Sequence, residues 1–105
     1  MQIVFGKEYL QELYETGKCS DKKHRFQPMV IRKYAICITY LERAKNIEDL
    51  FPINGLRYEV LKGDKKGISS VRINDQYRLE FTVSEDGQEP VITICTILDI
   101  TNHYK

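Results

Sequence analysis

The spacing of apolar residues changes near Leu56, and this change constrains the fold more than any other feature of the sequence. Before Leu56 the apolar residues recur at intervals of three and four, as they do on one face of a helix. After it they alternate with polar residues, as on a half-buried strand. The order predicts an α+β protein: a short first strand at Gln2–Phe5, two helices, and then an antiparallel sheet of three or four strands with both helices packed on one face.

Two amphipathic stretches are predicted to be the helices. Residues 7–18 carry apolar side chains at helical spacing, and Gly17 is placed to end that helix. A polar linker at residues 19–24 follows. The second helix is predicted to begin near Phe26, where Pro28 suits a first turn because its missing amide would have no helical partner there. The apolar stripe of this helix consists of Val30, Tyr34, Cys37 and Leu41.

The second half of the chain reads as strands joined by tight turns. One apolar set on two predicted strands comprises Val71, Ile73, Tyr77, Leu79, Phe81 and Val83. Arg72 and Arg78 fall on the opposite faces of these strands, so we expect them side by side on a sheet face that the helices leave open. After a second turn at residues 85–87, the apolar run of residues 91–100 suits a strand that is covered on both sides or lies at the middle of the sheet.

Length and composition limit the classes of protein that fit. A chain of 105 residues can bury one modest core, so we expect residues 1–105 to form a single domain. Three cysteines without a CxxC spacing argue against a disulfide framework or a zinc site. The N-terminus lacks a signal-peptide pattern, and no stretch nears the roughly 20 apolar residues that span a bilayer. We therefore expect a cytoplasmic protein with no membrane partner.

Charge is unevenly distributed although the net charge is only +1. Residues 57–78 contain six cations and three anions, whereas residues 79–100 contain five anions and no cation. The six cations are Arg57, Lys62, Lys65, Lys66, Arg72 and Arg78. This polarity predicts a local site for an anion rather than a uniformly basic surface.

The residue types in this segment suit the chemistry of RNA cleavage. Arginine holds a phosphate through two parallel hydrogen bonds, so Arg72 and Arg78 together can offset charge that develops on it. Near the end of the chain, His103 can transfer protons at neutral pH, and Tyr104 offers a ring for base stacking. With Lys62, these residues could cleave a phosphodiester without a cofactor or metal ion, since no carboxylate cluster suggests a metal site.

Simpler interpretations of the same residues remain open. Arg72 and Arg78 could be solvated strand residues paired with Asp75 and Glu80. Lys65 and Lys66 are as compatible with solubility as with phosphate contacts. A histidine so close to a chain end is commonly a surface residue.

Two segments resemble a known family: GLRYEVLKGDKKGISSVRINDQYRLEF, and ILDITNHYK at the end of the chain. Over residues 56–104 the sequence is similar to toxins of the RelE/ParE superfamily, most closely the HigB-like toxins. The shared pattern is an LKGD-type loop, an S-x-R strand, a W/Y-R-hydrophobic-x-F strand and a C-terminal motif with His and Tyr. The resemblance implies a toxin of a type II toxin-antitoxin system that cleaves mRNA in the ribosomal A site without a metal.

The resemblance also implies roles for individual residues. Lys62 would contact phosphate or move a proton, Arg72 would hold the scissile region, and Arg78 would stabilise the transition state. His103 and Tyr104 match the C-terminal catalytic and stacking positions. Their order here is Asn-His-Tyr, where the family often has Asp-Tyr-His, so either residue can be the acid.

Further implications concern the surroundings of the site and the partners. Glu59 stands where many HigB-like toxins have a histidine, so it could act as a base or indicate weaker activity. Lys65, Lys66 and Arg57 would contact RNA. The implied partners are the ribosome, mRNA and a HigA-like antitoxin with a helix-turn-helix, and operator DNA would be contacted only through the antitoxin complex.

Two other functions are compatible with the same fold. One is a non-enzymatic, ParE-like poison of a protein target such as DNA gyrase, and the other is an inactive module that only binds an antitoxin. The presence of His103 and Tyr104 beyond the basic segment favours the nuclease.

Overall fold

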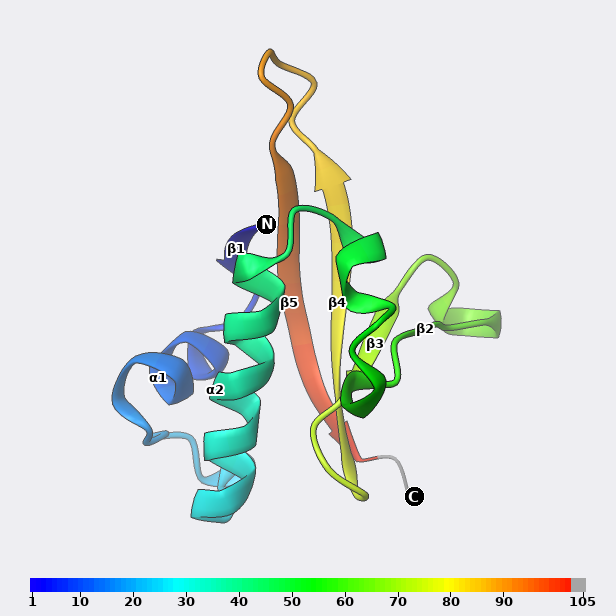
Figure 1. Ribbon diagram of the computed structural model, residues 1–105. Coiled ribbons are helices and arrows are strands. Elements are labelled where there is room, and N and C mark those ends of the chain that lie inside the picture. The colour runs from blue at the N-terminus through cyan, green and yellow to red at the C-terminus, as the bar shows by residue number, and fades with distance from the viewer. Residues whose placement is uncertain (103–105) are drawn as a thin grey trace.

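The computed structural model describes residues 1–102 and shows a five-stranded sheet with the strand order β1-β5-β4-β3-β2. The strands are β1 (Gln2–Phe5), β2 (Glu59–Val60), β3 (Ser69–Arg72), β4 (Tyr77–Glu85) and β5 (Thr93–Asn102). Strands β2 to β5 pair antiparallel, whereas β1 pairs with β5 in parallel. The predicted α+β architecture is confirmed, and the first strand joins the same sheet beside the last (Figure 1).

The two predicted helices are confirmed as α1 (Glu8–Thr16) and α2 (Pro28–Arg43). Gly17 ends α1 in the left-handed conformation, with φ of 73°, and its amide donates to the carbonyl of Leu13. Pro28 begins α2, as its missing amide allows. Short 3₁₀ turns connect the elements: η1 (Lys22–His24), η2 (Ile47–Leu50), η3 (Asn54–Leu56) and η4 (Gly63–Lys65).

The core lies between the helices and one face of the sheet. Tyr34 of α2 is completely buried and donates a hydrogen bond of 2.7 Å to the carbonyl of Leu10 in α1. The apolar set predicted for β3 and β4 faces this core, with Tyr77 and Val83 partly buried at its margin. Cys37 and Cys95 are buried as small apolar side chains, and burial raises the pKa of each thiol to about 12.

β5 differs from the prediction at its first residues but not in its central position. It lies between β1 and β4, yet it begins at Thr93, and Val91 and Ile92 precede it as exposed residues. The carboxylate of Asp86 accepts hydrogen bonds from the amides of Gln88 and Ile92, and this holds the connection from β4 as a loop. Apolar character alone cannot distinguish such a loop from a strand.

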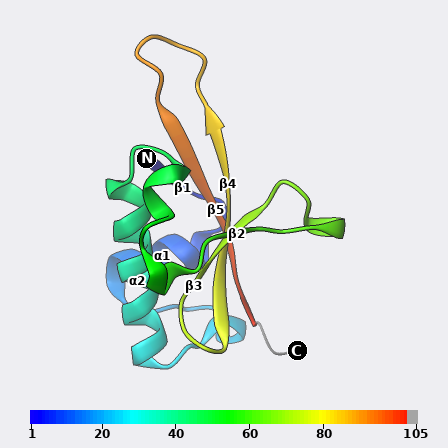
Figure 2. The same cartoon turned by 45° about the vertical axis from the view of Figure 1, so that its right-hand side comes forward.

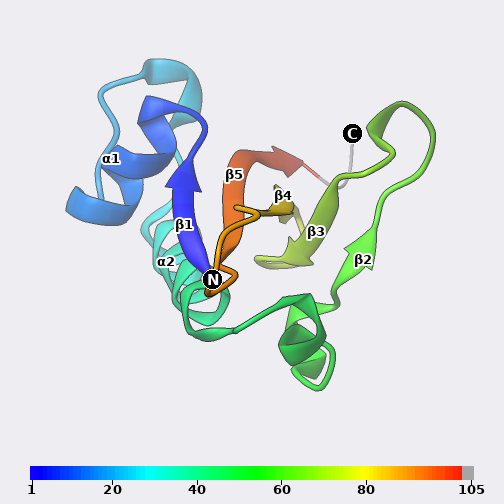
Figure 3. The same ribbon diagram turned by 90° about the horizontal axis from the view of Figure 1, so that it is seen from above.

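The face of the sheet opposite the helices carries a projecting loop, residues 61–68 between β2 and β3. Figure 2 shows this loop and the end of β5 on the side away from α1 and α2, and Figure 3 shows the same separation from above. Gly63 and Gly67 have positive φ angles of 67° and 90°, which lets the loop turn back toward the sheet. None of the helices in residues 1–102 has the length and apolar character needed to cross a bilayer.

Gly6 tests the junction between β1 and β5. Its amide donates to the carbonyl of Ile97, and an added Cβ would lie 2.7 Å from that oxygen. We expect Gly6→Ala to lower the free energy of unfolding by about 1–3 kcal/mol, because backbone must shift to accept the methyl group. Urea unfolding measures the change, with Gly55→Ala as the control since its Cβ meets nothing within 4 Å. Equal stability of the two variants would contradict the packing described for this junction.

Candidate active site

A hollow of about 530 Å³ lies on the sheet face away from the helices. Strand β2, the loop of residues 61–68, and strands β3, β4 and β5 all contribute to it. Its lining consists of Glu59, Leu61, Lys62, Lys65, Ser70, Arg78, Glu80, Asp99, Ile100, Thr101 and Asn102. Thus the LKGD loop and the strand ends that the sequence singled out do meet in space.

Arg78 is held on β4 by a set of backbone and side-chain acceptors. Its Nε donates to the hydroxyl of Ser70, and its Nη2 donates to the carbonyl of Arg57 at 2.7 Å. Glu59 approaches the same Nε at 3.4 Å, and only 11% of the Arg78 side chain is exposed. Burial lowers the pKa of Arg78 from its ordinary value, while Glu59 opposes that shift.

The backbone of Arg57 is shaped for this contact. Arg57 has a φ of 44°, in the left-handed region that residues other than glycine seldom adopt. It follows η3, and in this conformation its carbonyl accepts from the guanidinium of Arg78. In the structure, Arg57 therefore contributes its backbone carbonyl to the site.

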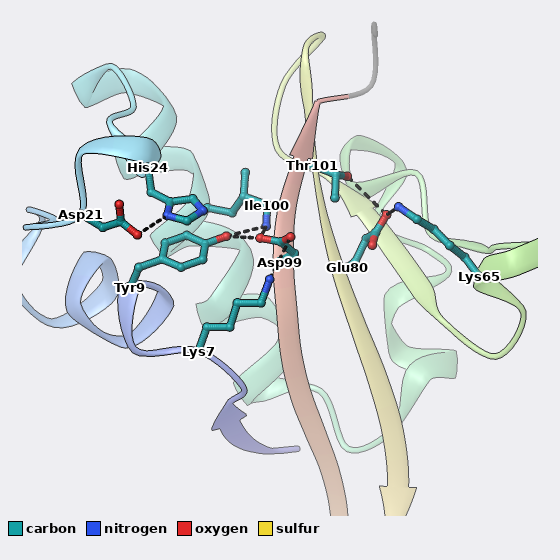
Figure 4. Close-up of polar contacts among 9 residues, drawn as sticks. All are labelled: Lys7, Tyr9, Asp21, His24, Lys65, Glu80, Asp99, Ile100 and Thr101. Atoms are coloured by element: carbon teal, nitrogen blue, oxygen red, sulfur yellow. Dashed lines mark hydrogen bonds and ion pairs between the residues drawn. The ribbon is translucent and has the colours of Figure 1, made fainter.

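Lys65 and Glu80 form an ion pair at the side of the hollow. Nζ of Lys65 lies 2.7 Å from Oε2 of Glu80, which also accepts from the hydroxyl of Thr101 at 3.3 Å (Figure 4). Glu80 is 7% exposed and Ser70 only 1%. The sheet face is therefore partly covered at this point, where Lys65 of the projecting loop pairs with Glu80 of β4.

The hollow is nearly balanced in charge. Its lining has three cations, Lys62, Lys65 and Arg78, and three acids, Glu59, Glu80 and Asp99. Glu59 belongs to the basic segment itself, and the fold brings two further acids to it, Glu80 from β4 and Asp99 from β5. An incoming phosphate must therefore compete with Glu59 and Glu80 for the cations.

The other predicted site residues lie in different places. Arg72 is paired in register with Arg78, but its guanidinium forms an ion pair with Asp75, as the simpler interpretation held. Within residues 1–102, the lining of the hollow includes neither Arg72 nor Lys66, which is exposed at the end of η4. His103 and Tyr104 lie outside the described residues, directly after Asn102 in the sequence.

A second polar group, which the sequence did not reveal, adjoins the hollow at β5 (Figure 4). Tyr9 donates a hydrogen bond to Asp99, and Lys7 forms an ion pair of 3.1 Å with the same carboxylate. The ring of His24 stacks on Tyr9 with centroids 3.7 Å apart. In the sequence, Tyr9 occupies a packing position of a helix and His24 lies in a linker. Their spacing therefore did not predict this contact.

Comparison with known proteins agrees with the fold. A solved YoeB/ParE toxin from Agrobacterium tumefaciens superposes with a TM-score of 0.61 at 25% identity, covering 99% of this chain and 100% of the other. The structure therefore has the RelE-like toxin fold. The family model of the RelE-like HigB toxin of type II toxin-antitoxin systems matches residues 3–93.

A curated relative supports the same assignment. Toxin HigB-1 of Vibrio cholerae is 37% identical over 82 residues, which are 77% of this chain and 82% of the relative. The chain belongs to the HigB-like toxin family, and it is a toxin of a type II toxin-antitoxin system.

Glu80→Gln tests the charge balance of the hollow. Removing this acid frees Lys65, so we expect inorganic phosphate to bind about fivefold more tightly, as a unit charge ~8 Å away would produce at an intermediate effective dielectric constant. The measurement is an NMR titration that follows the amides of Ser70 and Thr101. Glu42→Gln is the control, because Glu42 is an exposed acid on α2. An unchanged affinity in Glu80→Gln would contradict competition between Glu80 and phosphate.

Proposed function

We propose that the protein is an mRNA interferase, a ribosome-dependent endoribonuclease that cuts mRNA in the A site without a metal ion. The observation that carries this proposal is the Arg78 guanidinium, which is 11% exposed and fixed by Ser70 and the Arg57 carbonyl beside Lys62. A preorganised cation in a site of low water content stabilises charge that develops on a phosphate better than a mobile one does.

The proposed reaction needs a base, a cationic site and an acid. The base removes the proton of the ribose 2′-hydroxyl, whose oxygen attacks the neighbouring phosphorus. The bond from phosphorus to the 5′-oxygen breaks, and the acid protonates that oxygen, leaving a 2′,3′-cyclic phosphate and a 5′-hydroxyl. Arg78 and Lys62 offset the charge of the pentacoordinate intermediate.

Proton transfer is assigned to three residues. Glu59 is the proposed base, because it lines the hollow and its carboxylate lies 3.4 Å from the guanidinium of Arg78, against which the phosphate would bind. His103 and Tyr104 are the proposed acid and stacking residue, with their division of roles left to experiment. They follow Asn102, which lines the hollow. Lys65 and Lys66 of the projecting loop, together with Arg57, are the proposed RNA contacts, while Arg72 holds the RNA beside the scissile phosphate.

A type II toxin has an antitoxin partner, and its proposed identity is a HigA-like protein with a helix-turn-helix. The antitoxin would cover the hollow and would contact operator DNA as part of the complex. The balanced charge of the hollow is compatible with this, because a protein partner can pair with both the acids and the cations that line it. The ribosome and mRNA are the proposed targets, and the cytoplasm is the proposed location.

Arg78→Ala should reduce cleavage of ribosome-bound mRNA by about 10²- to 10³-fold, the usual cost of removing a group that stabilises the transition state. Arg78→Lys should also be impaired, since an ammonium cannot contact Ser70, the Arg57 carbonyl and a phosphate together. Primer extension on a defined message, with and without ribosomes, measures the cuts. The control is Arg43→Ala, an exposed arginine on α2. Absence of cuts by the unchanged protein would favour the non-enzymatic poison or the inactive module.

Glu59→Gln should lower the maximal cutting rate by about 10²-fold, as expected for loss of a general base. One of the two variants His103→Ala and Tyr104→Phe lacks the acid, and its maximal cutting rate should fall by a similar factor. A message with sulfur in place of the 5′-bridging oxygen separates these roles, because a thiolate of pKa about 8.5 leaves without protonation. This sulfur-containing message should restore cutting by the variant that lacks the acid, but it should not restore cutting by Glu59→Gln. A rate within about threefold of normal for Glu59→Gln would contradict its role as base.

A further inference from the structure

β5 continues beyond the strand that flanks it. β1 pairs with residues 94–97 of β5 and ends at Phe5, and the amide of Gly6 makes the last bond, to the carbonyl of Ile97. Within residues 1–102, no strand pairs with β5 on this side after Ile97. The segment of β5 that reaches the hollow thus leaves an edge where backbone amides need other acceptors.

Tyr9 of α1 supplies that acceptor. The amide of Ile100 donates to the hydroxyl of Tyr9 at 3.1 Å and to Oδ1 of its neighbour Asp99 at 3.0 Å. The Tyr9 hydroxyl in turn donates to Oδ1 of Asp99, and Lys7 holds the other carboxylate oxygen. A side chain 91 residues away in sequence therefore substitutes for the missing strand.

The surroundings keep this contact intact. Tyr9 is 6% exposed, and the ring of His24 covers it in a nearly parallel stack with an interplanar angle of 7°. His24 is itself held at 2.9 Å by Asp21, which caps η1. Burial, together with the bond to Asp99, raises the pKa of Tyr9 well above its usual value, so the hydroxyl remains a donor at neutral pH.

The contact coincides with an irregularity in β5. Glu80 pairs with Asp99 but Phe81 pairs with Ile97, so Leu98 is an extra residue in the ladder, a β-bulge. Bulges redirect the strand that follows them. The residues that follow this bulge, Asp99 to Asn102, all line the hollow, and Thr101 contacts Glu80 there.

We infer that Tyr9 is a positioning residue for the proposed nuclease: with Asp99 it fixes the bulge of β5 and thereby aims the strand end, Ile100 to Asn102, that lines the hollow. This inference rests on the proposed function for its catalytic consequence. Tyr9 itself lies in α1 and does not line the hollow in the part of the chain that the structure describes.

Tyr9→Phe tests the inference, because it keeps the ring and removes the hydroxyl. We expect the maximal rate of mRNA cleavage to fall about tenfold or more, with KM for the ribosome-bound message unchanged, as for a misplaced catalytic group. Tyr34→Phe is the matched control. Tyr34 is also buried, and its hydroxyl donates to the carbonyl of Leu10 in α1 rather than to a group of β5. It should keep a rate within about twofold of normal.

NMR gives a second readout that does not depend on activity. In Tyr9→Phe the Ile100 amide should exchange with solvent faster and the amide signals of Thr101 and Asn102 should shift, whereas Tyr34→Phe should leave them in place. Equal cutting rates in the two variants, or unchanged Thr101 and Asn102 signals in Tyr9→Phe, would overturn the inference. If the unchanged protein makes no cuts, the proposed function fails, and the amide data alone decide whether Tyr9 places the end of β5.

Discussion

The site depends on keeping one guanidinium charged where water has little access. A buried charge is costly unless hydrogen bonds and opposite charges replace its hydration, and Arg78 receives both. Ser70, the carbonyl of Arg57 and the carboxylate of Glu59 provide them from three segments. Because these partners come from β3, β2 and the turn before it, the sheet edge and the cation stabilise each other. The left-handed backbone of Arg57 is a local cost that this arrangement compensates.

β5 connects this site to the rest of the molecule. Its first half completes the sheet beside β1 and β4, and its second half passes the hollow with support from α1 through Tyr9. The helical half of the chain therefore does more than cover the core, since it also places a wall of the site. The ion pair of Lys65 with Glu80 joins the projecting loop to the neighbouring strand in the same way.

Much of the fold could be predicted because helix and strand impose different periods on local sequence. Alternation likewise assigned Arg78 and Arg72 to the face away from the core. Alternation does not predict which groups a side chain contacts, however. Arg72 forms an ion pair with Asp75 in the turn that follows it, whereas Arg78 contacts residues of β2 and β3. The contact of Tyr9 with Asp99 joins residues 90 apart and resembles packing in any local pattern, so the structure was needed to find it.

In the proposed mechanism, the scissile phosphate of a message lies against Arg78. The most direct test is a cryo-electron microscopy structure of the protein on a ribosome whose A-site codon carries 2′-deoxyriboses, so that the attacking hydroxyl is missing and the complex persists. We expect a message phosphate within hydrogen-bonding distance, about 3 Å, of the Arg78 guanidinium, with Glu59 facing the 2′ position. A message bound elsewhere on the protein, such as against α2, or no binding in the A site, would contradict it.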